Sequence, residues 1–191
     1  MDEKQLIKKI KSGNMDAFSQ LVSIYEKKAI NFARRMLGDT CEAEDAAQEA
    51  FLKVFDKIHT FREESSFSTW FFTVLNNVCL DILRKRSRRA DTVSINQSDD
   101  NGENYELPIE DTADGPYETL QKNEVKRLFE DALGNLSDEH RSVIIMRDIN
   151  GFEYEEIARI LDISVGTVKS RISRARLALR RILEEHRELF T

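Results

Sequence analysis

The chain of 191 residues carries 35 acidic and 29 basic residues, a formal charge of −6, and 40% hydrophobic residues. This apolar content is enough for a folded core and argues against a wholly disordered protein. No apolar run approaches the roughly 20 residues of a membrane span, and the charged N-terminal segment lacks the apolar core of a signal peptide, so we expect a cytoplasmic protein. The cysteines and histidines show no metal-ligand spacing, and no nucleophile, phosphate-loop or dinucleotide motif is present. We therefore expect neither an enzyme nor a metal or cofactor site.

Residues 1–90 are predicted to form a first helical domain. Apolar residues from Ala17 to Met36 recur at helical spacing, and Gly38 is typical of the residue that ends a helix. A second helix is predicted after Thr40, with one apolar face from Ala47 to Ile58.

A polar stretch, FREESSFS, precedes a third helix that is predicted to begin near Ser68 or Thr69 and to run into the basic segment RKRSRR. At 100° per residue its apolar side chains form one buried face. The opposite face is expected to carry Thr69, Thr73, Asn76, Asn77 and Arg84, with Trp70 at its edge. Amides, an aromatic ring and cations on one surface suit unpaired bases. Aromatic residues at this spacing also occur in cores, and that interpretation stays open for Phe67, Trp70 and Phe72.

Residues 91–115 are predicted to form a flexible acidic linker. This segment holds eight acidic residues, no Lys or Arg, and no sustained apolar period. Without it the remaining chain has a charge of +2 (−6 plus 8), so the acidic total does not exclude a nucleic-acid partner.

Residues 116–191 are predicted to form a second helical domain that contains a helix-turn-helix. Tyr117–Gly134 reads as one helix, and Ser137 is the expected N-cap of the next. A short helix over 153–161 is followed, after only three residues, by a basic helix that begins near Val165.

The basic helix separates into two faces. The predicted inward face consists of Val168, Ile172, Ala175 and Leu179, and Ser164 is the expected N-cap. The side chains on or flanking the opposite face are Thr167, Lys169, Ser170, Ser173 and Arg174, with Arg171 and Arg176 nearer the rim. This arrangement is typical of a recognition helix that contacts base edges while its rim cations bind phosphates. The alternative is an amphipathic helix with a solvated basic face.

Three segments resemble motifs of one family, in that family's order and spacing. They are DAAQEAFLKVFDKI, FSTWFFTVLNNVCLDILRKR and EEIARILDISVGTVKSRISRAR. The chain resembles RNA polymerase sigma factors of the extracytoplasmic-function (ECF) group of the sigma-70 family. The resemblance implies a region 2 domain over 1–90 and a region 4 domain over 116–191. It implies as partners core RNA polymerase, promoter DNA (double-stranded at minus thirty-five, single-stranded at minus ten) and an anti-sigma factor.

The resemblance also assigns roles to individual residues. The positions implied to bind core polymerase are Asp45, Gln48, Glu49 and Leu52. The positions implied to bind the minus-ten element are Arg62, Phe67, Trp70, Thr73, Asn76, Asn77, Arg84 and Lys85. The positions implied to bind the minus-thirty-five element are Thr167, Lys169, Ser170, Arg171, Ser173, Arg174 and Arg176. Asn76 departs from the basic residue that many relatives carry at its position.

Two other functions compete with this interpretation. A conventional helix-turn-helix regulator would bind palindromic half-sites without polymerase, with the first domain serving dimerisation or sensing. An enzyme acting on nucleic acid would need a carboxylate cluster or metal motif, and the sequence offers none.

Overall fold

The computed structural model describes residues 2–93 and 116–184, and within them the predicted all-α fold is confirmed. The helices of the first half are α1 (Glu3–Lys11), α2 (Met15–Leu37), α3 (Thr40–Lys57) and α4 (Phe67–Val93), with a short 3₁₀ turn at Ile58–Thr60. The helices of the second half are α5 (Pro116–Gly134), α6 (Asp138–Ile144), α7 (Tyr154–Leu161) and α8 (Val165–Glu184), with a π-helical turn at Ile145–Ile149. Of the predicted linker, residues 91–93 belong to α4 and 94–115 lie outside the described residues.

The boundaries of α2 and α3 follow from their capping residues. The Asn14 side chain accepts a hydrogen bond from the Ala17 amide (2.9 Å) and starts α2. Gly38 ends α2 with φ of 77°, a left-handed conformation that costs glycine little, as the sequence predicted. Asp39 then caps α3 by accepting from the Glu42 amide (2.7 Å).

The helix α1 was not predicted from the sequence. Its side chains Leu6, Ile7 and Ile10 are buried, and the helix packs against α2. The Tyr25 hydroxyl donates a hydrogen bond to Glu3 (2.5 Å), which ties α1 to the middle of α2. Burial, reinforced by this carboxylate, raises the pKa of Tyr25. The apolar spacing in LIKKI is a helical signal, but it spans barely one turn among lysines.

Aromatic rings fill the centre of the first lobe, which comprises α1 to α4. Phe71 of α4 lies 4.8 Å from Phe51 of α3 and 5.4 Å from Tyr25 of α2, measured between ring centroids. The helix α4 begins at Phe67, slightly earlier than predicted, because Ser66 caps it by accepting from the Thr69 amide (3.1 Å).

The second lobe, α5 to α8, contains the predicted helix-turn-helix. Ser137 starts α6 by accepting from the His140 amide, as expected. Glu153 and Glu156 form a capping box at the start of α7. Asp162 ends α7 in a left-handed conformation (φ 52°), and α8 follows after Ser164. The tight turn fixes α8 against α6 and α7.

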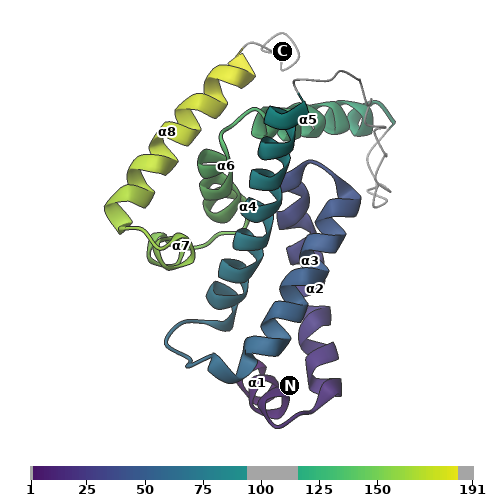
Figure 1. Ribbon diagram of the computed structural model, residues 1–191. Helices are drawn as coiled ribbons and strands as arrows, with labels where there is room; N and C mark the ends of the chain where they lie inside the picture. Colours follow the sequence, from purple (N-terminus) through teal and green to yellow (C-terminus); the bar gives the residue numbers. More distant parts are fainter. Residues whose placement is uncertain (1, 94–115, 185–191) are drawn as a thin grey trace.

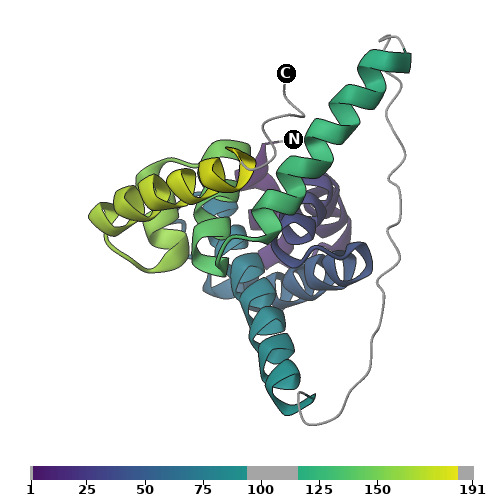
Figure 2. The same cartoon turned by 90° about the horizontal axis from the view of Figure 1, so that it is seen from above.

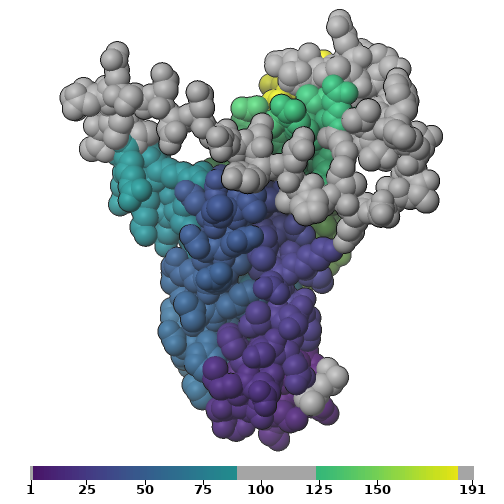
Figure 3. All heavy atoms as spheres, turned by 90° about the vertical axis from the view of Figure 1, so that its right-hand side faces the viewer, coloured from purple at the N-terminus to yellow at the C-terminus, as the bar shows by residue number. Residues whose placement is uncertain are grey.

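The two lobes pack directly against each other. In Figure 1, α4 runs between α2 and α3 on one side and α6, α7 and α8 on the other, and the view from above agrees (Figure 2). The helix α7 packs on α4, while α5 and α6 contact α2. Figure 3 shows the green part of α5 above the purple and blue surface of the first lobe. One continuous apolar core therefore spans both lobes.

The two cysteines differ sharply in accessibility. Cys41 is exposed on α3, whereas Cys79 is buried on α4 and its burial raises the thiol pKa to about 12. Because the thiolate is the reactive form, we expect one thiol of the native chain to react with Ellman's reagent at pH 8 and the second to react only after unfolding. Cys41→Ser is the control and should remove the fast phase. Two fast thiols in the native chain would contradict the buried position of Cys79.

Candidate nucleic-acid and polymerase interfaces

The exposed face of α3 carries the residues predicted to bind core polymerase. Their spacing along the chain, by three, one and three residues, places them on one side of the helix. They are Asp45, Gln48, Glu49 and Leu52. All four are exposed, and Leu52 exposes 66% of its surface. Glu49 also pairs with Lys53 (2.7 Å) on the same helix. An exposed leucine beside carboxylates is a surface that a basic and apolar protein partner fits.

The helix α8 has the buried face that the sequence predicted, consisting of Val168, Ile172, Ala175 and Leu179. Ser164 caps the helix, since its Oγ accepts a hydrogen bond from the Thr167 amide (3.1 Å). The packing of α8 therefore fixes which of its side chains reach solvent.

Opposite the packed side, the first half of α8 is open. Lys169, Ser173 and Arg174 are exposed, whereas Thr167 and Ser170 are half-buried. Ser170 Oγ donates a hydrogen bond to the Thr167 carbonyl (2.9 Å), so the hydroxyl proton of this serine is used within the helix. A helix that presents polar and cationic side chains along its N-terminal half has the form that enters the major groove of DNA.

The rim arginines of α8 are held by acidic residues of the same lobe. Arg171 pairs with Glu139 (3.1 Å), and Arg176 donates two hydrogen bonds to Asp148. The hydrogen bond to Asp148 raises the pKa of Arg176. Neither acidic partner was predicted from the sequence, because both lie about 30 residues away along the chain. The ion pairs orient these guanidinium groups and partly neutralise them.

Tyr154, at the start of α7, is a further element of this surface. The Lys169 ammonium lies 5.9 Å from its ring centroid and the Arg147 guanidinium 4.8 Å. Arg147 also donates to the Phe152 carbonyl (2.8 Å) and pairs with Glu153 (2.9 Å). The face of the aromatic ring therefore attracts both cations, and it draws the Lys169 side chain toward the side of α8 on which Tyr154 lies. The sequence singled out neither Tyr154 nor Arg147.

On α4, part of the predicted minus-ten surface is accessible. Asn77, Arg84 and Lys85 are exposed, and Trp70 and Thr73 are half-buried. Arg84 pairs with Asp81 of the preceding turn (3.2 Å), an exposed contact that a phosphate readily replaces.

The indole of Trp70 packs against Phe61, the residue that follows the 3₁₀ turn. Its ring centroid lies 5.1 Å from that of Phe61. In the loop Arg62 is exposed, and its neighbour Glu63 has φ of 59°, an uncommon conformation for a residue with a side chain. Phe61 therefore contacts the Trp70 ring and directly precedes Arg62 in the chain.

Two predicted minus-ten residues, Phe67 and Asn76, are buried, which corrects the expectation that they face DNA. Phe67 exposes 2% of its surface, and its ring packs edge-on against Tyr25 (5.3 Å) and Phe61 (5.8 Å). It belongs to the core, the alternative that the sequence left open. Asn76 exposes 1% of its surface, although helical spacing placed it on the polar face of α4. The helix α7 also packs on α4, and helical spacing within one lobe does not reveal which side chains such packing buries.

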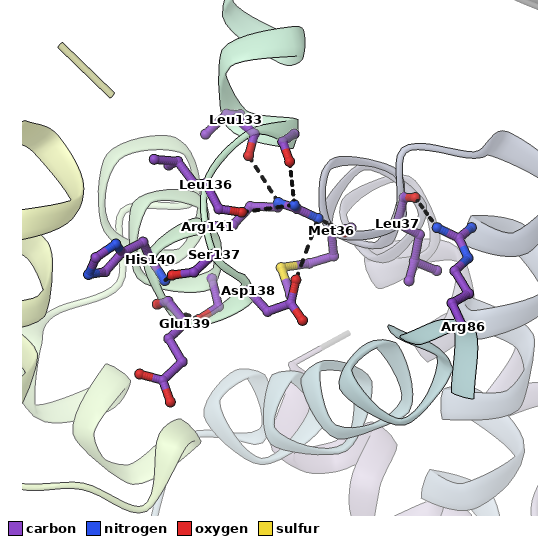
Figure 4. A network of polar contacts seen from close by, with 12 residues as sticks. Met36, Leu37, Arg86, Leu133, Leu136, Ser137, Asp138, Glu139, His140 and Arg141 are labelled. Atoms are coloured by element: carbon purple, nitrogen blue, oxygen red, sulfur yellow. Dashed lines mark hydrogen bonds and ion pairs between the residues drawn. The ribbon is translucent and has the colours of Figure 1, made fainter. Parts of the chain in front are cut away.

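The C-terminal end of α2 is capped by two arginines from other elements (Figure 4). Arg86 of α4 donates to the Leu37 carbonyl (2.8 Å) and pairs with Glu42. Arg141 of α6 donates to the Met36 carbonyl across the lobe boundary. Cations are favoured at this negative end of a helix dipole. Arg86, within the basic segment RKRSRR, therefore makes contacts that stabilise the fold.

Membrane spans and metal sites are both absent from residues 2–93 and 116–184. No helix of this part of the chain is long and apolar enough to cross a membrane. No group of three or more His, Cys, Asp or Glu side chains in the same residues is placed to hold a metal ion.

Models of known protein families match the sequences of both lobes. A Sigma-70 region 2 model matches residues 21–89, and a Sigma-70 region 4 model matches residues 126–179. The ECF RNA polymerase sigma factor SigW of Bacillus subtilis is 35% identical over 184 residues, covering 95% of this chain and 97% of SigW. The chain belongs to the ECF RNA polymerase sigma factors. The ECF sigma-E factor of Haemophilus influenzae is 33% identical over 177 residues, 92% of each chain.

Two solved structures share the fold of this sigma factor. RpoE of Bartonella quintana, in complex with the anti-sigma factor NepR, matches with a TM-score of 0.66 and 29% identity, covering 87% of this chain and 96% of that one. CnrH, in complex with the cytosolic domain of CnrY, matches with a TM-score of 0.68 and 24% identity, covering 96% and 97%. As a sigma factor, the protein binds core RNA polymerase and directs promoter-specific transcription initiation through regions 2 and 4.

Proposed function

We propose that three surfaces divide the work of initiation in this sigma factor. The exposed face of α3 binds core polymerase, the exposed part of α4 and the loop before it bind the single minus-ten strand, and α8 binds the minus-thirty-five element. The proposed domains are residues 1–90 and 116–191. The protein acts in the cytoplasm as a binding protein without catalytic chemistry of its own. An anti-sigma factor is a proposed partner, because the relative from Bartonella quintana has one.

The observation that carries the minus-thirty-five assignment is the geometry of α8. Arg174 and Ser173 lie opposite the buried Ile172 and Ala175, so their side chains point away from the domain. Lys169 extends the same exposed surface toward the N-terminal end of the helix. Such a helix, supported by a short helix at a tight turn, reads base edges in the major groove.

The minus-ten assignment rests on Asn77, Arg84, Lys85, Trp70 and Thr73 of α4. An amide hydrogen-bonds to exposed base edges, and cations neutralise the strand's phosphates. The indole offers a surface on which an unpaired base stacks. Arg62 lies in the loop just before α4, where it reaches the same strand. Asn76 and Phe67 are left out of this surface because they are buried.

Run-off transcription tests the assignment as a whole. Core polymerase from a bacterium that encodes this chain is assayed on promoter libraries with and without the protein. We expect discrete transcripts only when both are present. Specific binding to palindromic DNA without polymerase, and no added transcript, would instead favour a conventional helix-turn-helix regulator.

Reversing the charges Asp45→Lys and Glu49→Lys is expected to weaken core polymerase binding by at least about tenfold. The reversal places like charges where a basic partner surface is expected, and such juxtaposition costs several kcal/mol. Pull-down of core polymerase measures the effect, and circular dichroism checks that helix content is unchanged. Glu26→Lys, an exposed reversal on α2, is the matched control. Equal pull-down of all three proteins would contradict the assignment of this face.

A further inference from the structure

The helix α1 lies next to the loop that leads into α4. Its apolar side chains Leu6, Ile7 and Ile10 are buried, and the helix packs against α2 and against the 3₁₀ turn at Ile58–Thr60. The Sigma-70 region 2 match begins at residue 21, so α1 precedes the matched stretch. The contacts of α1 with the loop therefore belong to a part of the chain to which the family match assigns no role.

Lys11, the last residue of α1, contacts the start of the loop. Its ammonium group donates a hydrogen bond to the Phe61 carbonyl (2.6 Å) and lies 5.6 Å from the centroid of the Phe61 ring. Lys11 is half-buried. A charged donor makes a stronger hydrogen bond than a neutral one, and partial burial reduces its screening by salt. Phe61 is therefore held both by its carbonyl and by its ring.

The hydrogen bond restrains the peptide group with which the loop begins. The Phe61 carbonyl and the Arg62 amide belong to one planar peptide group, which rotates as a unit. A donor bound to this carbonyl therefore restricts the backbone direction at Arg62, whose side chain is exposed. The next residue, Glu63, has φ of 59°, a conformation that persists only where surrounding contacts hold the chain. Lys11 supplies one of these contacts.

The other end of the loop is held at the start of α4. Ser66 Oγ accepts a hydrogen bond from the Thr69 amide (3.1 Å) and lies 2.8 Å from the Thr69 hydroxyl oxygen. Residues 62–64, between the two held ends, are exposed. A short loop that is held at both ends loses less conformational entropy when its exposed residues bind a strand. Lys11 thus contributes to a preorganised loop.

The Phe61 ring extends the influence of Lys11 to Trp70. The centroids of these two rings lie 5.1 Å apart, and their planes are inclined by 32°. The Phe61 ring also packs edge-on against the buried Phe67 (5.8 Å). The ammonium group near the Phe61 ring favours one position of that ring. Because Phe61 packs against the indole, its position limits how the indole meets a stacked base.

We propose that Lys11 is a positioning residue for the minus-ten strand. It does not contact the strand; it holds Phe61, and through Phe61 it places Arg62 and Trp70 in the arrangement that binds unpaired DNA. This inference rests on the proposed assignment of the minus-ten surface to α4 and the loop before it. The helix α1 then has a function beyond packing, because it supports the strand-binding loop from outside the region 2 match.

Two other roles for Lys11 lead to different results. If its ammonium group bound a phosphate of the strand, removing it would reduce the salt slope of binding by about 0.7. If Lys11 only stabilised the packing of α1, removing it would lower stability and leave strand binding by the folded protein unchanged. A positioning role weakens strand binding at an unchanged salt slope, and the effect becomes smaller when Arg62 is absent.

The experiment uses holoenzyme assembled from the full-length chain and the core polymerase of the run-off assay. Fluorescence anisotropy at several salt concentrations measures binding of a labelled single strand of about twelve nucleotides, carrying the minus-ten sequence of a promoter active in that assay. Lys11→Met removes the ammonium group and keeps a flexible, unbranched side chain. Lys11→Gln is a second neutral variant, and Lys11→Arg keeps a cationic donor. Lys8→Met, which changes an exposed lysine of the same helix, is the matched control.

We expect Lys11→Met to weaken strand binding about fivefold, the effect of a loop that is competent to bind in about a fifth of the molecules. The salt slope should stay the same. Lys11→Gln should act in the same direction, whereas Lys11→Arg should restore most of the affinity and Lys8→Met should leave it unchanged. In the Arg62→Ala background, Lys11→Met should weaken binding by less than about twofold, because one of the groups that it positions is gone.

Circular dichroism checks that each variant is folded at the temperature of the assay. Three results would overturn the inference. The first is unchanged strand binding by folded Lys11→Met and Lys11→Gln, which would leave Lys11 a role in packing alone. The second is an equal loss in the original and the Arg62→Ala backgrounds, which would mean that Lys11 acts independently of the loop. The third is a reduced salt slope, which would make Lys11 a phosphate contact.

Failure of the underlying assignment gives a different pattern. Arg62→Ala and Asn77→Ala alter exposed residues of the proposed minus-ten surface itself. If both leave strand binding unchanged, the minus-ten assignment is wrong and the inference about Lys11 fails with it. If both weaken strand binding while Lys11→Met does not, the assignment stands and only the positioning role of Lys11 is wrong.

Discussion

Replacing Arg141 by alanine is expected to lower the free energy of unfolding by about 2–4 kcal/mol. The guanidinium donates to four backbone carbonyls, those of Met36, Leu133, Gly134 and Leu136. Three lie around the α5–α6 connection and one at the end of α2, so a single side chain joins the two lobes (Figure 4). Without it, partly buried carbonyls at two helix ends lose charged hydrogen-bond donors.

Urea unfolding followed by circular dichroism measures this change. Arg141→Lys is an informative companion, because an ammonium group keeps the charge but not the planar fork that reaches several carbonyls at once. It should recover less than half of the loss. Arg180→Ala is the control: Arg180 is exposed and pairs with Glu184 on the same helix, so its removal should cost no more than about 0.5 kcal/mol. Equal stability of Arg141→Ala and Arg180→Ala would contradict the role of Arg141.

Removing Arg174 is expected to weaken binding to a matched minus-thirty-five sequence by about 1–3 kcal/mol, and binding to a scrambled sequence by much less. Arg174 is exposed on the side of α8 opposite Ile172, in the half of the helix that meets base edges. Arg176 and Arg180 lie toward the rim and the distal end. Their removal should weaken binding to both sequences about equally and reduce the salt slope by about one for each phosphate that is no longer neutralised.

Binding to both sequences at several salt concentrations separates these behaviours. The ion pair of Arg176 with Asp148 adds a test that the sequence did not suggest. Because Asp148 partly neutralises this arginine, Asp148→Asn should strengthen binding to both sequences. Equal weakening of matched and scrambled DNA by Arg174→Ala would show that the reading surface of α8 has been wrongly assigned.

The sequence was sufficient to predict the features that depend only on residues close together in the chain. Apolar spacing predicted the buried face of α8, and the capping preferences of Ser137, Ser164 and Gly38 predicted three helix ends correctly. These features are set within a few residues by hydrogen bonds and side-chain direction, which sequence spacing encodes. The helix α1 was missed because its apolar signal spans barely one turn and becomes meaningful only where α2 covers it.

The sequence by itself determined the all-α class, the helix-turn-helix and the exposed surfaces of α3 and α8, because each follows from local periodicity. Only the tertiary structure decided that Asn76 is buried and that the second lobe packs on α4, with Glu156 against Thr69. The same holds for the acidic partners of Arg171 and Arg176. These contacts join residues 28 to 87 positions apart, and no helical spacing records which polar faces meet. Their geometry follows from how the packed helices bring distant segments together.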